Sequence, residues 1–140
     1  MKIRTDFVTN SSSSSFIIAY KDVPPDNPND FYYNLYKEVI KSIAEAKDDY
    51  GDTDSAEIYE SKEDFDNHFV SCYGWKDQTI EDIFHTDSYL SEFYHKIIGY
   101  LNDGYSIMDK NIDYSDDSLK DLIRTLSQGN ENFIIISEDG

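Results

Sequence analysis

Two short, almost wholly apolar segments at opposite ends of the chain limit the fold more than any other feature. They are residues 16–20, Phe-Ile-Ile-Ala-Tyr, and residues 133–136, Phe-Ile-Ile-Ile. A short run of consecutive apolar residues, bounded by turn-forming residues, is typical of a β-strand that is buried on both faces. We therefore predict that these N- and C-terminal strands lie centrally in one sheet and that helices cover it.

Amphipathic patterns between these two strands predict the helices. Apolar residues recur every three or four positions in residues 30–47, 61–73, 79–84, 88–101 and 115–128. Ser61, Thr79 and Ser115 are suited to cap three of these helices. Further strands are predicted at residues 3–8, 56–60 and 105–114. The prediction is a single α+β domain, residues 1–140, in which a mixed sheet of about four to six strands is covered by about four or five helices.

The strand at residues 105–114 changes its apolar parity. Tyr105 and Ile107 occupy odd positions, whereas Ile112 and Tyr114 occupy even ones. One inserted residue moves every following side chain to the other face of a sheet. We therefore predict an interruption or bulge at residues 109–111.

Five consecutive serines, residues 11–15, follow Thr9 and Asn10. Such a polar run favours a solvated loop between the strands at residues 3–8 and 16–20. A phosphate-binding loop needs glycines and a Lys-Ser or Lys-Thr ending, and the run has neither. A serine nucleophile needs a base and an orienting group, for which the sequence offers no motif, so we assign no catalytic residue.

The stretch from Lys2 to Ile17, KIRTDFVTNSSSSSFI, resembles an N-terminal segment of many small uncharacterised bacterial and bacteriophage proteins. The resemblance is confined to the N-terminus. It implies a microbial setting, including mobile genetic elements. It implies no activity, cofactor or site residue.

The charge balance is strongly acidic, with 29 Asp and Glu against 12 Lys and Arg and a formal net charge of −17. Such a charge repels phosphate backbones and anionic membranes, and it favours association with basic surfaces. We therefore predict a protein partner with a basic surface, and no direct binding of nucleic acid or membranes. The predicted partner-binding residues are the carboxylates of one acidic stretch: Asp48, Asp49, Asp52, Asp54, Glu57, Glu60, Glu63, Asp64 and Asp66.

Three classes of function fit these observations. The first is an acidic binding protein: an inhibitor, an immunity factor or a nucleic-acid mimic that occupies a basic groove. The second is a small enzyme with an unfamiliar site, acting on a cationic substrate. The third is a subunit of a homo-oligomer, since the unpaired edges of terminal strands allow homodimers. The absence of catalytic motifs and the abundance of tyrosine, which protein interfaces favour, place the binding protein first.

Neither of two candidate metal sites is predicted. Aligned as a calcium loop from Asp52, the chain places Glu57 where the sharp turn requires glycine. His68 and Cys72 lie four residues apart, on one face of a helix, as two zinc ligands would. However, Cys72 follows Phe65 and Phe69 along the apolar stripe, where a thiol behaves as a small hydrophobic group. No cofactor is predicted.

The cellular compartment is predicted from what the sequence lacks. It contains one cysteine, its first residues form no apolar signal segment, and no run reaches the roughly 20 apolar residues of a membrane span. These features favour a cytoplasmic protein.

Overall fold

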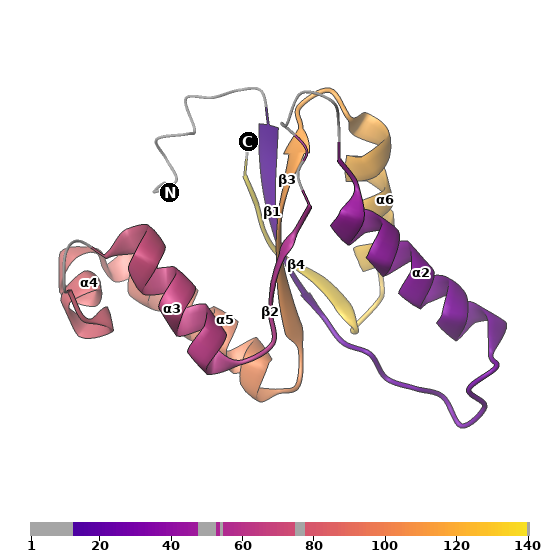
Figure 1. Cartoon of the computed structure of the whole chain (residues 1–140), viewed down its shortest axis with the longest axis horizontal. Helices are drawn as coiled ribbons and strands as arrows, with labels where there is room; N and C mark the ends of the chain where they lie inside the picture. The colour runs from indigo at the N-terminus through magenta and orange to yellow at the C-terminus, as the bar shows by residue number, and fades with distance from the viewer. Residues whose placement is uncertain (1–12, 48–52, 54, 75–77, 140) are drawn as a thin grey trace.

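The computed structural model describes residues 13–47, 53, 55–74 and 78–139, and a four-stranded antiparallel sheet forms its centre (Figure 1). The strands are β1 (Ser13–Tyr20), β2 (Glu57–Tyr59), β3 (Ser106–Asp113) and β4 (Phe133–Asp139), in the order β2-β3-β1-β4. Five helices accompany them in the described residues: α2 (Phe31–Glu45), α3 (Lys62–Tyr73), α4 (Ile80–Thr86), α5 (Ser88–Asn102) and α6 (Asp117–Ser127). The predicted α+β class is confirmed.

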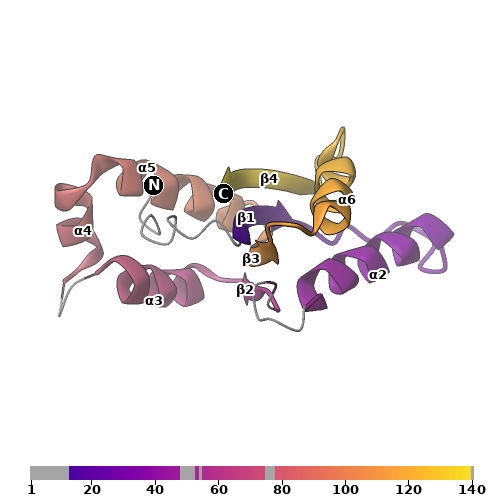
Figure 2. The ribbon, with the colours of Figure 1, turned by 90° about the horizontal axis from the view of Figure 1, so that it is seen from above.

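The helices lie on both faces of the sheet, so the molecule has three layers (Figure 2). On one face α3, α4 and α5 cover a cluster that includes Phe65, Phe69, Tyr94, Ile97 and Ile107. On the other face α2 and α6 cover a second cluster, which comprises Phe16, Ile18, Ile43, Ala44, Met108, Ile112, Ile123 and Phe133. Side chains of β1 alternate between the two clusters, which explains why residues 16–20 read as one continuous apolar run.

The position of the C-terminal strand was predicted wrongly. The N-terminal apolar strand, β1, pairs with both β3 and β4 and is central, but β4 pairs only with β1 in the described part of the chain and lies at the edge. All the strand pairs are antiparallel, so the sheet is not mixed. An apolar run indicates that both faces of a strand are covered, but it does not indicate which strands pair with its two edges.

The predicted interruption of the strand at residues 105–114 is also wrong. β3 is continuous, and it pairs with β1 in one unbroken register from Ser106 to Asp113. The register shift lies in β4 instead, where Ile17 is opposite Ser137 and Ile18 is opposite Ile135. Because both faces of β3 are covered, apolar residues occupy odd and even positions alike, and a change of parity does not require an inserted residue.

Two of the three predicted helix caps are confirmed. The side chains of Ser61 and Thr79 accept hydrogen bonds from the backbone N–H three residues later, and so does Asp30 at the start of α2. The cap of α6 is Asp116 rather than the predicted Ser115. The predicted strand at residues 3–8 lies outside the described residues.

The serine run does not form a loop throughout. Ser13, Ser14 and Ser15 are the first residues of β1, opposite Asp113, Ile112 and Asn111 of β3. Pairing with a neighbouring strand outweighs the weak strand preference of serine here. Across the described residues, no helix has the length and apolar character that crossing a membrane requires.

Candidate functional site

The described part of the predicted acidic stretch forms one corner of the molecule, where β2 leads into α3. Glu57, Glu60, Glu63 and Asp64 are exposed there, and we call these four residues the acidic corner. Asp48, Asp49, Asp52 and Asp54 lie outside the described residues. The structure therefore brings four of the nine predicted carboxylates together at the surface.

Local sequence positions these carboxylates. In β2, Tyr59 is buried, whereas Glu57, two residues earlier on the same face of the strand, is exposed. Ser61 then caps α3 by accepting a hydrogen bond from the N–H of Asp64 at 3.1 Å. Glu63 and Asp64 occupy the first turn, at the positive end of the helix dipole, where a negative charge is stabilised.

Asp66, the ninth predicted residue, is committed to contacts within the protein. One of its oxygens accepts a hydrogen bond from the Tyr94 hydroxyl at 2.5 Å, and the other pairs with the Lys62 ammonium at 2.6 Å. Burial, followed by the hydrogen bond to Asp66, raises the pKa of Tyr94, so the hydroxyl remains a donor at neutral pH. Asp66 therefore joins α3 to α5 and is not available to a partner in the way that the acidic corner is.

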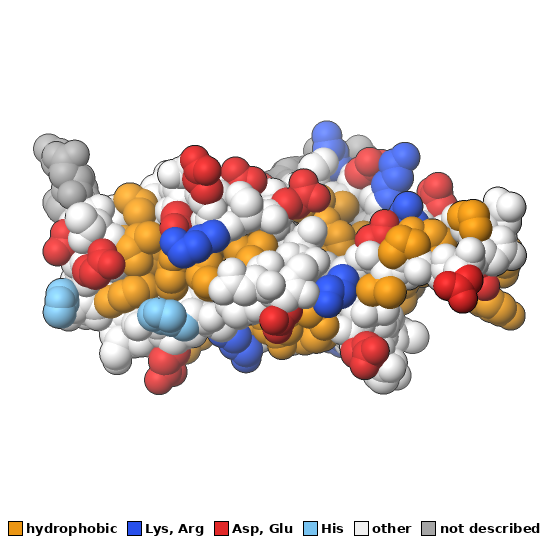
Figure 3. Space-filling view, turned by 90° about the horizontal axis from the view of Figure 1, so that it is seen from below, with side chains coloured by type: hydrophobic (Ala, Val, Ile, Leu, Met, Phe, Trp, Pro, Cys, Tyr) orange, Lys and Arg blue, Asp and Glu red, His pale blue; other side chains and the backbone are white. Residues whose placement is uncertain are grey.

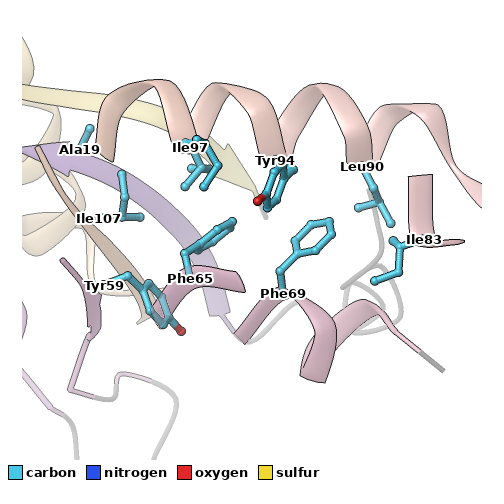
Figure 4. Packing of buried hydrophobic residues seen from close by; sticks show 10 residues of the cluster. Ala19, Tyr59, Phe65, Phe69, Ile83, Leu90, Tyr94, Ile97 and Ile107 are labelled. Atoms are coloured by element: carbon cyan, nitrogen blue, oxygen red, sulfur yellow. The ribbon is translucent and has the colours of Figure 1, made fainter. Parts of the chain in front are cut away.

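A cavity of about 190 Å³ lies between α3, α5 and the sheet, and its lining residue Tyr59 contacts Glu57 of the acidic corner. Its walls are mainly aromatic, and two carboxylates and two serines also line it. The lining residues are Ser15, Ile17, Tyr59, Phe65, His68, Tyr73, Tyr89, Leu90, Phe93, Ile107, Asp109, Ser137 and Glu138. Figure 4 shows the neighbouring core, where Phe65 and Phe69 of α3 point toward Tyr94 and Ile97 of α5.

Tyr59 links the cavity to the acidic corner. Its hydroxyl donates a hydrogen bond to Glu57 Oε2 at 2.8 Å, and its ring packs against His68 with centroids 4.7 Å apart. Burial is the main cause of a raised pKa for Tyr59, and the hydrogen bond to Glu57 adds to it. The tyrosine therefore stays protonated and holds one carboxylate of the corner at the edge of the cavity.

His68 and Cys72 are in contact on the exposed flank of α3. The Cys72 sulfur lies 3.5 Å from His68 Nε2 and 3.7 Å from Nδ1, and Glu57 Oε2 lies 3.8 Å from Nδ1. Cys72 is exposed, so its predicted place on the buried stripe is wrong. Tyr73 rather than Cys72 follows Phe69 on the buried face, because four residues bring a side chain nearly back above the first.

The remaining cations add little positive charge to this surface. Lys110 and Lys120 are buried, and their ammonium groups donate hydrogen bonds to backbone carbonyls, at 2.5 Å to Ala46 and 2.7 Å to Tyr114. Arg124 pairs with Glu138, and this contact lowers the pKa of the Glu138 carboxyl. Several cations of the chain thus stabilise the fold and do not offset the acidic corner.

Sequence reasoning missed the cavity and two of its charged residues. Asp109 and Glu138 come from β3 and β4, far from the acidic stretch in sequence, and only strand pairing brings them to one place. The alternation of Met108, Lys110 and Ile112 was a usable signal, since it directs Asp109 to the opposite face. Among the described residues, no group of three or more His, Cys, Asp and Glu is arranged to hold a metal ion.

No protein-family model matches this chain, and neither does any curated protein or solved structure. The resemblance of residues 2–17 to a segment of bacterial and bacteriophage proteins therefore stays a prediction. Most of that segment precedes the described residues.

Proposed function

We propose that this protein binds a partner protein with a basic surface, and that a Lys or Arg side chain of the partner enters the cavity beside the acidic corner. The observation that carries the proposal is an aromatic-walled cavity beside Glu57 of the acidic corner, whose carboxylate accepts a hydrogen bond from the lining residue Tyr59. Aromatic faces attract cations, and carboxylates pair with them, so the two features favour the same kind of side chain.

The size of the cavity supports a single inserted side chain. Sites for cofactors and drug-sized ligands are usually about 300–1,000 Å³, whereas this cavity measures about 190 Å³. Interfaces typically gain most of their affinity from a few anchors that fill such pockets, surrounded by a polar rim. The acidic corner would form that rim, and Tyr59 would hold part of it in place.

Charge distribution supports steering of a basic partner. A net charge of −17 raises the rate of encounter with a cationic surface at low salt. On the face seen in Figure 3 the acidic side chains are scattered among hydrophobic and basic ones. That scatter supports one charged anchor point more than an extended imitation of a phosphate backbone.

The test is affinity capture from nuclease-treated bacterial lysate, followed by NMR titration with the captured protein. We expect a basic protein that is released as salt rises, with shifts centred on residues 57–68 and Tyr89. The quadruple variant Glu57→Gln, Glu60→Gln, Glu63→Gln, Asp64→Asn should lose at least tenfold in affinity. The matched control is Glu38→Gln, Glu45→Gln, Glu81→Gln, Glu92→Gln, which removes the same number of exposed charges elsewhere.

A pair of single variants tests the anchor. Tyr89→Ala removes a ring from the cavity wall, and Tyr32→Ala removes an exposed ring from α2, far from the cavity. We expect only Tyr89→Ala to weaken capture. If the two charge variants bind equally well, or if the two tyrosine variants do, the proposed site is wrong.

One observation favours a second candidate, a thiol-dependent activity. The contacts of Cys72 with His68, and of His68 with Glu57, place a nucleophile, a base and an orienting group in sequence at the edge of the cavity. Such a thiol should react with a chromogenic aromatic disulfide faster than free cysteine does, and His68→Ala should remove the difference. Equal rates for the wild type and His68→Ala would exclude this candidate.

A further inference from the structure

Helix α2 carries a stripe of apolar side chains that the described residues leave largely uncovered. Phe31, Leu35 and Val39 recur every four residues, and Tyr32 lies beside them; we call these four residues the α2 stripe. Phe31 is 68% exposed, Tyr32 is 77% exposed and Leu35 is 48% exposed, while Val39 is partly buried. Contiguous exposed apolar surface of this kind typically marks an interaction site.

The stripe is exposed because α2 buries side chains only near its C-terminal end. Ile43 and Ala44, near its C-terminus, are its buried residues. Toward the N-terminus the helix extends beyond the sheet, at the right of Figures 1 and 2. Phe31 and Tyr32 contact each other edge to face, with centroids 5.4 Å apart, and both remain exposed to solvent.

The charge of α2 differs from that of the opposite end of the molecule. Within α2, Lys37 and Lys41 balance Glu38 and Glu45. Two acidic residues adjoin the helix: the cap Asp30, and Asp22, which lies 3.5 Å from Lys37. Helices α3 and α4, at the far end in Figure 2, both carry more acidic than basic residues. A basic partner is therefore drawn away from α2, whereas two copies of this acidic chain repel each other least when they meet there.

We propose that a second copy of this chain covers the α2 stripe by packing its own α2 antiparallel against it, around a two-fold axis at Leu35. The spacing of the stripe suits this symmetry, because the two ends exchange places: Phe31 faces Val39 of the second copy, and Leu35 faces its own equivalent. A two-fold contact needs one self-complementary patch, and the stripe is such a patch.

The geometry of paired helices makes the arrangement specific. Helix axes pack about 8–10 Å apart, and Cα atoms lie about 2.3 Å from each axis. The two Leu35 Cα atoms therefore come within about 3.4–5.4 Å. The upper part of this range is a distance that a disulfide bridges. A stripe of four side chains is much smaller than the roughly 20–30 residues a side of a standard interface, so we expect a weak dimer.

Sedimentation equilibrium between about 10 µM and 1 mM tests this directly. We expect the mass to rise with concentration from 16.3 kDa toward twice that value, and to rise further at 500 mM NaCl, because salt screens repulsion between the two acidic copies. Leu35→Glu should remain monomeric. Tyr89→Glu, which alters an exposed side chain on α5, should associate as the wild type does.

A cross-link tests the symmetry itself. In a Cys72→Ser background, Leu35→Cys should form a covalent dimer under mild oxidation at least tenfold faster than Tyr89→Cys. A wild type that stays monomeric at every concentration, or equal rates for the two cysteine variants, overturns the proposal. Binding of a basic partner is independent of this result, since Leu35→Glu leaves the acidic corner and the cavity unchanged.

Discussion

Helices α2 and α5 have the same length, and both carry an apolar stripe, but they differ in what covers them. Each spans 15 residues. In α5 the buried residues Leu90, Tyr94, Ile97 and Ile98 run along most of the helix, whereas in α2 burial is confined to Ile43 and Ala44 near one end. An amphipathic pattern therefore shows that a helix has an apolar face, but it does not show what covers that face.

The difference arises from the number of layers around each helix. Tyr94 of α5 packs against rings from both α3 and α4, with centroids 5.1 Å from Phe69 and 5.2 Å from Phe84. On the other face α2 contacts the sheet through its C-terminal half, and in the described part of the chain no second helix covers its N-terminal half. One face of the sheet thus contains a closed aromatic core, and the other leaves an apolar stripe open.

The largest expected effect is a difference between these two regions in how much a mutation lowers the free energy of unfolding. Phe69→Ala removes a fully buried ring that contacts Tyr73, Phe84 and Tyr94, and should lower the free energy of unfolding by about 3–5 kcal/mol. Phe31→Ala on α2 should change it by no more than about 0.5 kcal/mol. Urea unfolding followed by circular dichroism measures both. Equal losses of unfolding free energy in the two variants would show that the α2 stripe is covered.

A smaller loss of stability is expected at the buried, C-terminal end of α2. The Lys110 ammonium donates hydrogen bonds to the carbonyls of Ala44 and Ala46, and so ties the end of the helix to β3. Lys110→Met keeps the volume but leaves these carbonyls without that donor, which should cost about 1–3 kcal/mol. Hydrogen exchange should show faster opening of α2 than of α5. Lys41→Met, on the exposed face of α2, serves as the control, and equal exchange in the two variants would refute the anchoring role.

The smallest effect concerns alkaline pH. Burial raises the pKa of Tyr36 to about 12, and its hydroxyl donates a hydrogen bond to the Asn132 carbonyl. Because unfolded tyrosine titrates near 10, the contribution of Tyr36 to stability is complete below pH 10 and is lost as the pH rises toward 12. For this half-buried group the loss is about 1 kcal/mol.

Tyr36→Phe should therefore flatten the decline in unfolding free energy between pH 9.5 and 11.5, measured by urea titration at each pH. Tyr32→Phe, on the open stripe, should leave the decline unchanged. An unaltered slope in Tyr36→Phe would mean that the hydroxyl is not held in the folded state as described.

Local sequence was sufficient for most elements of the fold. Caps at Ser61 and Thr79, together with the apolar spacing of α5, located helices because a cap and a stripe depend on residues within a few positions of each other. The acidic corner was predicted for the same reason, since Glu57, Glu60, Glu63 and Asp64 are close in sequence. The cap of α6 was misplaced by one residue, where Ser115 and Asp116 offer the same chemistry.

The sequence by itself determined that the chain forms an α+β domain with a strongly acidic surface and two buried apolar strands. The tertiary structure decided that β4 lies at the edge, that Asp109 and Glu138 meet aromatic rings in one cavity, and that the α2 stripe stays open. The physical reason is the distance along the chain over which each interaction acts. Propensity, capping and charge act between neighbours along the chain, whereas strand order and cavities depend on residues that meet only after the chain has folded.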